Sequence, residues 1–314
     1  MPDSVTPMAT SAAPRSVAAP EPVLRHRGRV ALLAAAAGVL LAVLWSHELV
    51  DSMIGQNVAS GLLGHDTRTG GITGALPGLL FAFVSGLAGT FTACNIAMVA
   101  SLGPMAGATT DRSARVRTFL HPVGLLAAGT VTVSAVYGFV GVLLGDRLPQ
   151  LSSATAAGMP VRLIQASVVF GAVGVALLVI GLGALGITAD PFAGRPAARV
   201  LVLGALIGCF LIGRPYPLFN QLFHWAAANG NPFYGAAAFV AQSLGNVLLV
   251  SIVFVLANLA TRGGLVRALA ASPRRSAVVT GGLLIALAAF TIAYWDVRVP
   301  ALFGYGWFPV MFYN

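Results

Sequence analysis

The sequence predicts an all-α protein that crosses a membrane several times, and its composition and charge pattern carry this prediction. Of 314 residues, 57% are hydrophobic and 9% are charged, whereas a soluble domain has about a quarter of its residues charged. The mean hydropathy is +0.87. The apolar residues form long runs, and about 20 such residues are enough for a helix to cross the hydrocarbon core of a bilayer. All basic side chains are arginine, and they lie mainly in short stretches between the runs.

The first apolar run, residues 30–50, predicts an N-terminal anchor helix. It follows residues 1–29, which are rich in Pro, Ala and Ser and typical of a disordered tail. A signal peptide is the alternative, but the run ends in SHELVDSM, which offers no small-residue cleavage site. Residues 51–74 are expected to form a loop. Six further spans are predicted at residues 75–105, 120–145, 161–186, 200–224, 233–260 and 276–296.

The arginines predict the orientation of these spans. Stretches on one side of the predicted membrane carry thirteen arginines, and stretches on the other side carry four. Cytoplasmic loops are enriched in basic residues, so we expect a cytoplasmic tail at residues 1–29 and a cytoplasmic loop at residues 187–199. The loop at residues 51–74 and the C-terminal tail at residues 298–314 are then extracytoplasmic. The net charge of +9 is therefore interpreted as a topology signal and not as a nucleic-acid surface.

The six spans after the anchor divide into two triplets, residues 75–186 and 200–297. In the first triplet Gly86 precedes Cys94 by eight residues, and in the second Gly208 precedes Tyr216 by eight. Each triplet continues with a span rich in small residues and ends with a smoother aliphatic span. Three spans are an odd number, so the triplets enter the membrane from opposite faces, and such inverted repeats place their working site near the midplane. The predicted fold is a six-helix inverted 3+3 repeat plus one anchor helix, seven spans in all.

Two short motifs in the first spans of the triplets carry a family resemblance. The sequence TAC ends at Cys94, with Ala93 before it, and RPYP contains Pro215 and Tyr216. These stretches resemble the two sites of the CcdA family and of the DsbD transmembrane domain, relatives within the LysE superfamily. In that family each site has a cysteine next to a proline. Here the first site keeps the cysteine without the proline, and the second keeps the proline with Tyr216 in the cysteine position.

The resemblance extends over about residues 75–297 and implies a relay that passes reducing equivalents by thiol–disulfide exchange, for cytochrome c biogenesis or another extracytoplasmic reduction. It implies a bacterial cytoplasmic membrane, thioredoxin as the cytoplasmic donor and a thioredoxin-like extracytoplasmic acceptor. Cys94 would be the carrier thiol. Cys209 is the second cysteine and lies seven residues before Tyr216, about 10 Å along a helix. A disulfide needs Cα atoms within roughly 7 Å, so Cys209 pairs with Cys94 only across offset or broken helices; otherwise it packs as a small hydrophobe.

Arg214 is the charged residue that the sequence places inside a span. An arginine at the centre of a membrane helix costs at least about 2.5 kcal/mol, so it normally faces a partner or a cavity. Its expected partners are Asn95, Tyr216, backbone carbonyls, an anionic ligand or a thiolate at Cys94, whose reactivity a nearby cation raises. Alternatively, Arg214 lies shallower and extends its side chain to the membrane interface.

Gln242 and Asn246 are four residues apart and so share one face of their predicted helix. Amides within a membrane either line a site or join helices by hydrogen bonds. The prolines Pro104, Pro215 and Pro217 are expected kink sites.

Several classes of chemistry lack support in the sequence. All nine acidic residues lie in the tail, in loops or at span ends, so the carboxylate of a typical proton-coupled transporter is missing. The five histidines show no metal-ligand spacing, and no phosphate-binding loop or nucleic-acid module is present. No cofactor, metal or nucleic-acid partner is therefore expected.

Three functions stay open. The first is the thiol–disulfide relay, which is catalytic only if Cys94 is redox active. The second is an exporter of the LysE-superfamily type for a small polar or anionic solute or a metal, with a site lined by Arg214, Asn95, Asn220, Gln242 and Asn246. The third is a non-catalytic subunit of a membrane assembly, which the replacement of a site cysteine by Tyr216 would suit.

Overall fold

The computed structural model describes residues 26–46, 48–64, 66–67, 71–89, 112–213, 217–261, 264, 272–309 and 311. This part of the chain is helical, apart from connecting segments and one antiparallel pair of two-residue strands, β1 (Thr155–Ala156) and β2 (Met159–Pro160).

The described helices up to residue 186 are α1 (Arg27–Leu44), the π-helix η1 (Glu48–Gly55), α2 (Gln56–Leu63), α3 (Ala75–Ala88), α5 (Arg112–Leu144), the 3-10 helix η3 (Gly145–Arg147) and α6 (Val161–Ala184). Those after it are α7 (Pro196–Gly213), α8 (Pro217–Asn229), α9 (Pro232–Ala260), α11 (Pro273–Ile292), the π-helix η4 (Ala293–Arg298) and α12 (Val299–Ala301).

Several of these helices suit a membrane. Five helical segments in the described chain are long and apolar enough to cross a bilayer: Arg27–Leu44, His121–Arg147, Val161–Ala184, Pro196–Gly213 and Arg274–Ala301. Helix α9 has 29 residues and no charged side chain, so it also exceeds the length that a span requires. Helix α3 is apolar but has only 14 residues. The expectation of an all-α, multi-pass membrane protein agrees with this architecture.

The helix boundaries differ from the expected spans in four places. Helix α5 begins at Arg112, eight residues before the expected start at residue 120. The run at residues 200–224 is divided between α7 and α8, and Pro217 is the first residue of α8. Proline lacks a backbone N–H and suits the first turn of a helix, which accounts for Pro217 at the start of α8. The kink expected at Pro217 stays a prediction, because the three residues before it lie outside the described residues, as do Pro104 and Pro215. The segment expected as a loop at residues 51–74 contains most of η1 and all of α2. The last span continues beyond residue 296 through η4 and α12.

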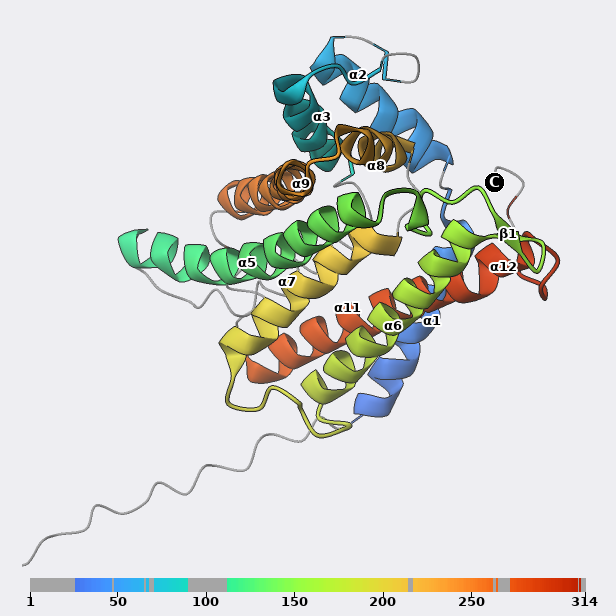
Figure 1. Cartoon of the computed structure of the whole chain (residues 1–314). Coiled ribbons are helices and arrows are strands. Elements are labelled where there is room, and N and C mark those ends of the chain that lie inside the picture. Colours follow the sequence, from blue (N-terminus) through green and yellow to red (C-terminus); the bar gives the residue numbers. More distant parts are fainter. Residues whose placement is uncertain are drawn as a thin grey trace, which may run out of the picture.

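Helix α5 joins two groups of helices (Figure 1). Helices α3, α8 and α9 gather on one side of it, and α1, α6, α7 and α11 lie on the other. Each group has its own buried hydrophobic cluster. Phe81, Leu222 and Phe239 belong to the cluster of the first group, and Leu177 and Leu284 belong to that of the second.

Helices α3 and α9 cross with their backbones in contact. A Cβ atom at Gly86 would overlap the carbonyl of Gln242, and a Cβ at Gly245 would overlap the carbonyl of Phe83. Glycine allows this approach because small residues let membrane helices pack closely.

Helices α5 and α7 cross in the same manner. A Cβ at Gly129 would overlap the carbonyl of Leu201, and a Cβ at Gly204 would overlap the carbonyl of Leu126. Here a hydroxyl adds a bond across the crossing, since Thr130 Oγ1 donates to the Gly204 carbonyl at 2.8 Å.

The N-terminal helix α1 is packed against α11. A Cβ at Gly38 would overlap the carbonyl of Ala286, and the rings of Trp45 and Phe290 meet edge to face with centroids 5.5 Å apart. Arg298, only 3% exposed, donates to the carbonyls of Ala42 and Trp45 at 2.8 and 2.7 Å. The arginine thereby satisfies carbonyls at the C-terminal end of α1, which have no partner within the helix itself.

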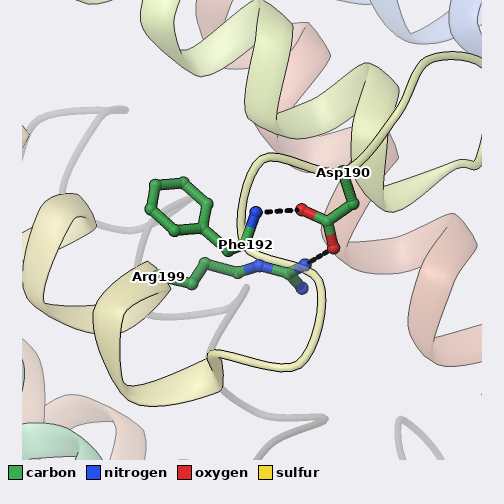
Figure 2. A network of polar contacts seen from close by, with 3 residues as sticks. All are labelled: Asp190, Phe192 and Arg199. Atoms are coloured by element: carbon green, nitrogen blue, oxygen red, sulfur yellow. Dashed lines mark hydrogen bonds and ion pairs between the residues drawn. The ribbon is translucent and has the colours of Figure 1, made fainter.

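The connection between α6 and α7 is held by one carboxylate. Asp190 accepts a hydrogen bond from the backbone N–H of Phe192 and an ion-paired hydrogen bond from Arg199 (Figure 2). Arg27, the first residue of α1, donates to the carbonyl of Gly186 in the same connection.

Candidate functional site

Three of the eight site residues that the sequence predicts are described, and they lie on α7 and α9: Cys209, Gln242 and Asn246. The remaining five lie outside the described residues: Cys94, Asn95, Arg214, Pro215 and Tyr216.

The described residues that flank the two motifs are in contact. Helix α3 ends at Ala88 and is followed by Gly89, five residues before Cys94. A Cβ atom at Gly89 would lie 3.2 Å from Cζ of Phe219, which is on the first turn of α8 and three residues after Tyr216. Gly89, which precedes the TAC motif, and Phe219, which follows the RPY stretch, therefore lie side by side.

Helix α9 contributes a buried amide at its crossing with α3. Gln242 is 1% exposed, and among the described residues neither its Nε2 nor its Oε1 has a hydrogen-bond partner. The backbone of Asn246, one turn later, also borders Gly86, whose Cβ would be 3.1 Å from the Asn246 nitrogen. The expected shared position of Gln242 and Asn246 on one side of α9 agrees with these contacts. Because leaving a buried polar group unpaired costs about 1–3 kcal/mol, the Gln242 amide is suited to binding a polar group from elsewhere.

The hydroxyls around this amide have partners of their own. Ser243, next to Gln242, is hydrogen-bonded to Ser134 of α5. Ser85 of α3 donates to the carbonyl of Ala82 in its own helix at 2.8 Å. The Ser243 hydroxyl therefore joins two helices and the Ser85 hydroxyl is satisfied within its own helix, whereas the Gln242 amide has no partner among the described residues.

A second glutamine, Gln165 of α6, lies next to the C-terminal end of α7. Gln165 of α6 donates through Nε2 to the carbonyl of Ile212 at 3.0 Å and to the hydroxyl of Tyr137 on α5 at 3.3 Å. Its Oε1 is buried and has no partner among the described residues. The accepting carbonyl is two residues before Arg214. In the sequence, Gln165 is a lone amide within the apolar run of residues 161–186, a pattern that predicts a buried polar contact.

Two amides of α8 form hydrogen bonds to connecting segments of the chain. Asn220 accepts a hydrogen bond from Gln150 Nε2 at 2.9 Å, and Gln221 donates to the carbonyl of Thr67 at 3.0 Å. Both bonds connect α8 to segments outside the long helices, which is the helix-joining role that amides often have in membranes.

Cys209 packs among apolar side chains. Its side chain is partly buried against the hydrophobic cluster of α1, α6, α7 and α11, and its thiol is free. Gly208 beside it faces α5, where its Cβ would be 3.0 Å from the Thr130 carbonyl. Four residues separate Cys209 from Gly213, the end of α7, about 6 Å along the axis.

The π-helix η4 carries two charged residues, Asp296 and Arg298. From the sequence, Asp296 was expected at the end of a span and Arg298 in the tail. Asp296 packs against α6, where a Cβ at Gly171 would lie 3.0 Å from its Oδ1, and its buried Oδ2 has no partner among the described residues. Arg298 was expected in the extracytoplasmic tail but is buried under α1. The expected span at residues 276–296 included Asp296 but ended two residues before Arg298, which belongs to the same continuous helical segment.

The described chain defines a multi-pass helical membrane protein with buried polar side chains at its helix crossings. In this part of the chain, no group of three or more His, Cys, Asp and Glu side chains could hold a metal ion. Comparison with models of protein families, with curated proteins and with solved structures gave no match for any part of the chain.

Proposed function

We propose that this protein is a thiol–disulfide relay of the CcdA and DsbD type that passes reducing equivalents across a bacterial cytoplasmic membrane. The observation that carries the proposal is the contact between Gly89 and Phe219. It brings the residues that flank the TAC motif next to those that follow the RPY stretch, as a site shared by both motifs requires.

We further propose that the two triplets form an inverted repeat, with α1 as an additional helix and seven spans in total. The two glycine crossings support this. At the α3–α9 crossing, Gly86 meets the carbonyl of Gln242, which lies three residues before Gly245. At the α5–α7 crossing, Gly204 meets the carbonyl of Leu126, which lies three residues before Gly129. This correspondence pairs Gly86 with Gly204, whereas the sequence comparison paired Gly86 with Gly208. A two-fold relation between the triplets accounts for the repetition of the arrangement.

In the proposed reaction the oxidised relay contains a disulfide between Cys94 and either Cys209 or a thiol of a partner. A thiolate of a cytoplasmic dithiol donor of the thioredoxin type attacks this disulfide, forming a mixed disulfide, and the second donor thiol then resolves it. The donor becomes a disulfide, and the relay gains two electrons and two protons. The relay passes both to the disulfide of an extracytoplasmic thioredoxin-like carrier. Arg214 would favour the thiolate form of Cys94, because a nearby cation stabilises the negative charge.

The redox state of the two cysteines tests this proposal. Membranes from cells that express the wild type, Cys94→Ala or Cys209→Ala are alkylated with a mass-tagging maleimide, with and without prior reduction. We expect thiols that become available only after reduction. A bond between Cys94 and Cys209 disappears in both variants, whereas a mixed disulfide to a partner disappears only in Cys94→Ala. Thiols that stay fully reduced under oxidising growth would exclude the relay.

The buried amide of Gln242 favours a second function, the export of a small polar or anionic solute. An amide with two unused hydrogen-bonding atoms can bind a solute that offers both a donor and an acceptor. Solutes released by cells that express the wild type or Gln242→Leu would be compared by mass spectrometry, with Cys94→Ala as the control. A solute that is lost only with Gln242→Leu supports transport, and identical profiles in all three strains contradict it.

A further inference from the structure

One end of the helix bundle has exposed arginines on two neighbouring helices. Arg27 and Arg29 lie in the first turn of α1, and Arg274 and Arg275 lie in the first turn of α11; all four are exposed. Among the described residues, Asp190 is the acidic residue in the connections at this end, and it is paired with Arg199 (Figure 2). The two arginine pairs therefore have no carboxylate counter-ion in the described chain.

The crossing of α1 and α11 determines how these pairs are placed. The helices run in the same direction, since Gly38 borders Ala286 and the later Trp45 borders Phe290. Arg27 precedes Gly38 by eleven residues, and Arg275 precedes Ala286 by eleven. Eleven residues are about three helical turns, so Arg27 lies on the same face of α1 as Gly38, and Arg275 lies on the same face of α11 as Ala286. These are the faces that the two helices turn toward each other.

The end of α6 lies between the two pairs. Arg27 donates to the carbonyl of Gly186 just after α6. From the other side, a Cβ at Gly281 of α11 would be 2.6 Å from Cγ of Leu185. The end of α6 thus lies between the first turns of α1 and α11 (Figure 1), and therefore between the two arginine pairs.

Apolar surface adjoins the arginines on the membrane side. Leu32 and Leu33, within two turns of Arg27 on α1, are 73% and 72% exposed. An amphiphile with a negative head and apolar chains matches this succession of charge and apolar surface. Guanidinium groups bind phosphate oxygens in a fork-like geometry, and basic pockets between membrane helices are a recurrent form of lipid headgroup site.

We infer that the arginine pairs Arg27/Arg29 and Arg274/Arg275, around the end of α6, bind the phosphate headgroup of an anionic phospholipid whose acyl chains lie against α1. The lipid supplies the negative charge that the described chain lacks at this end. The inference is independent of the thiol chemistry, because neither cysteine is involved. It goes beyond a topology signal, which requires basic residues on one side of the membrane but no selective binding of a lipid.

Lipid titration of the purified full chain tests the inference. Phosphatidylglycerol or phosphatidylcholine is added to the protein in an uncharged detergent, and bound lipids are counted by native mass spectrometry. The test variant is Arg274→Gln/Arg275→Gln. The matched control is Arg147→Gln/Arg162→Gln, which removes two exposed arginines at the opposite end. A second test variant, Arg29→Gln/Arg274→Gln, spares Arg275 in case the first variant does not fold.

We expect the wild type and the control to bind phosphatidylglycerol selectively. The test variants should bind it roughly thirtyfold more weakly, as expected when two arginine charges near an anionic headgroup are removed. Equal affinity of the test variants and the wild type for phosphatidylglycerol would overturn the inference. Equal binding of phosphatidylcholine by the wild type would do the same. Inorganic phosphate that competes fully with the lipid would show a site for the free anion, and would overturn the assignment to a phospholipid.

Discussion

The α3–α9 and α5–α7 crossings have the same backbone arrangement but different chemistry. Between α5 and α7, Leu126 is 2% exposed, and Thr130 Oγ1 donates to the carbonyls of Leu126 and Gly204 at 3.0 and 2.8 Å. Between α3 and α9, the position that corresponds to Leu126 is Gln242, whose amide is buried and unpaired within the described chain. The glycines thus set the distance between the helices, while the neighbouring side chains decide whether the polar atoms at the crossing are paired.

The largest expected effect comes from filling the glycine positions. Gly204→Ala places a Cβ on the carbonyl of Leu126, so we expect α5 and α7 to separate and the free energy of unfolding to fall by about 3 kcal/mol, at the upper end of the range for overpacking. Gly86→Ala should have a similar effect at the α3–α9 crossing. The thermal midpoint of the purified protein in detergent measures both changes.

The control for the glycine variants is Gly282→Ala on α11. A Cβ there would have no neighbour within 4 Å, and alanine has the higher helix propensity, so this variant should be as stable as the wild type or slightly more stable. Equal midpoints for Gly204→Ala and Gly282→Ala would contradict the close backbone contact.

A smaller change in the free energy of unfolding, of opposite sign, is expected when the α3–α9 crossing is made to resemble the α5–α7 crossing. Gln242→Leu replaces an unpaired buried amide with the side chain found at the corresponding position in the α5–α7 crossing. Removing the unpaired polar group should stabilise the folded protein by about 1–2 kcal/mol. Reversible unfolding in mixed micelles would measure the difference. A strong loss of stability would mean that the amide has a structural partner, and the proposed solute site would have to be abandoned.

The smallest effect is expected from the hydroxyl at the α5–α7 crossing. Thr130→Val removes the hydrogen bond to the Gly204 carbonyl, and interhelical bonds of this kind contribute about 0.6 kcal/mol in membrane proteins. Thr132→Val is the control, because Thr132 Oγ1 bonds only to Ala128 of its own helix in the described contacts. The difference between the two variants in unfolding free energy isolates the bond across the crossing. No difference would leave the glycine contacts as the main cause of the close approach.

The class of fold and the positions of most helices follow from the sequence alone. Runs of apolar residues specify membrane helices because the hydrocarbon core demands about 20 of them whatever their partners. Pro217 was expected as a kink within one span, and the structure has it as the first residue of a separate helix, α8. The residue spacing also predicted that Gln242 and Asn246 lie on one side of α9, since helical periodicity is a local property.

Which helix faces which, and therefore what the polar side chains contact, depends on packing between distant parts of the chain. Gly204 and Gly208 are four residues apart and lie on the same side of α7. Helical periodicity therefore does not decide which of the two glycines occupies the position equivalent to Gly86 in the proposed repeat. The bond from Gln165 to the Ile212 carbonyl joins residues 47 positions apart. Arg298 is buried because α1, more than 250 positions away, offers it two carbonyls. Local sequence sets the face on which a side chain lies, whereas its partner depends on helix packing at long range.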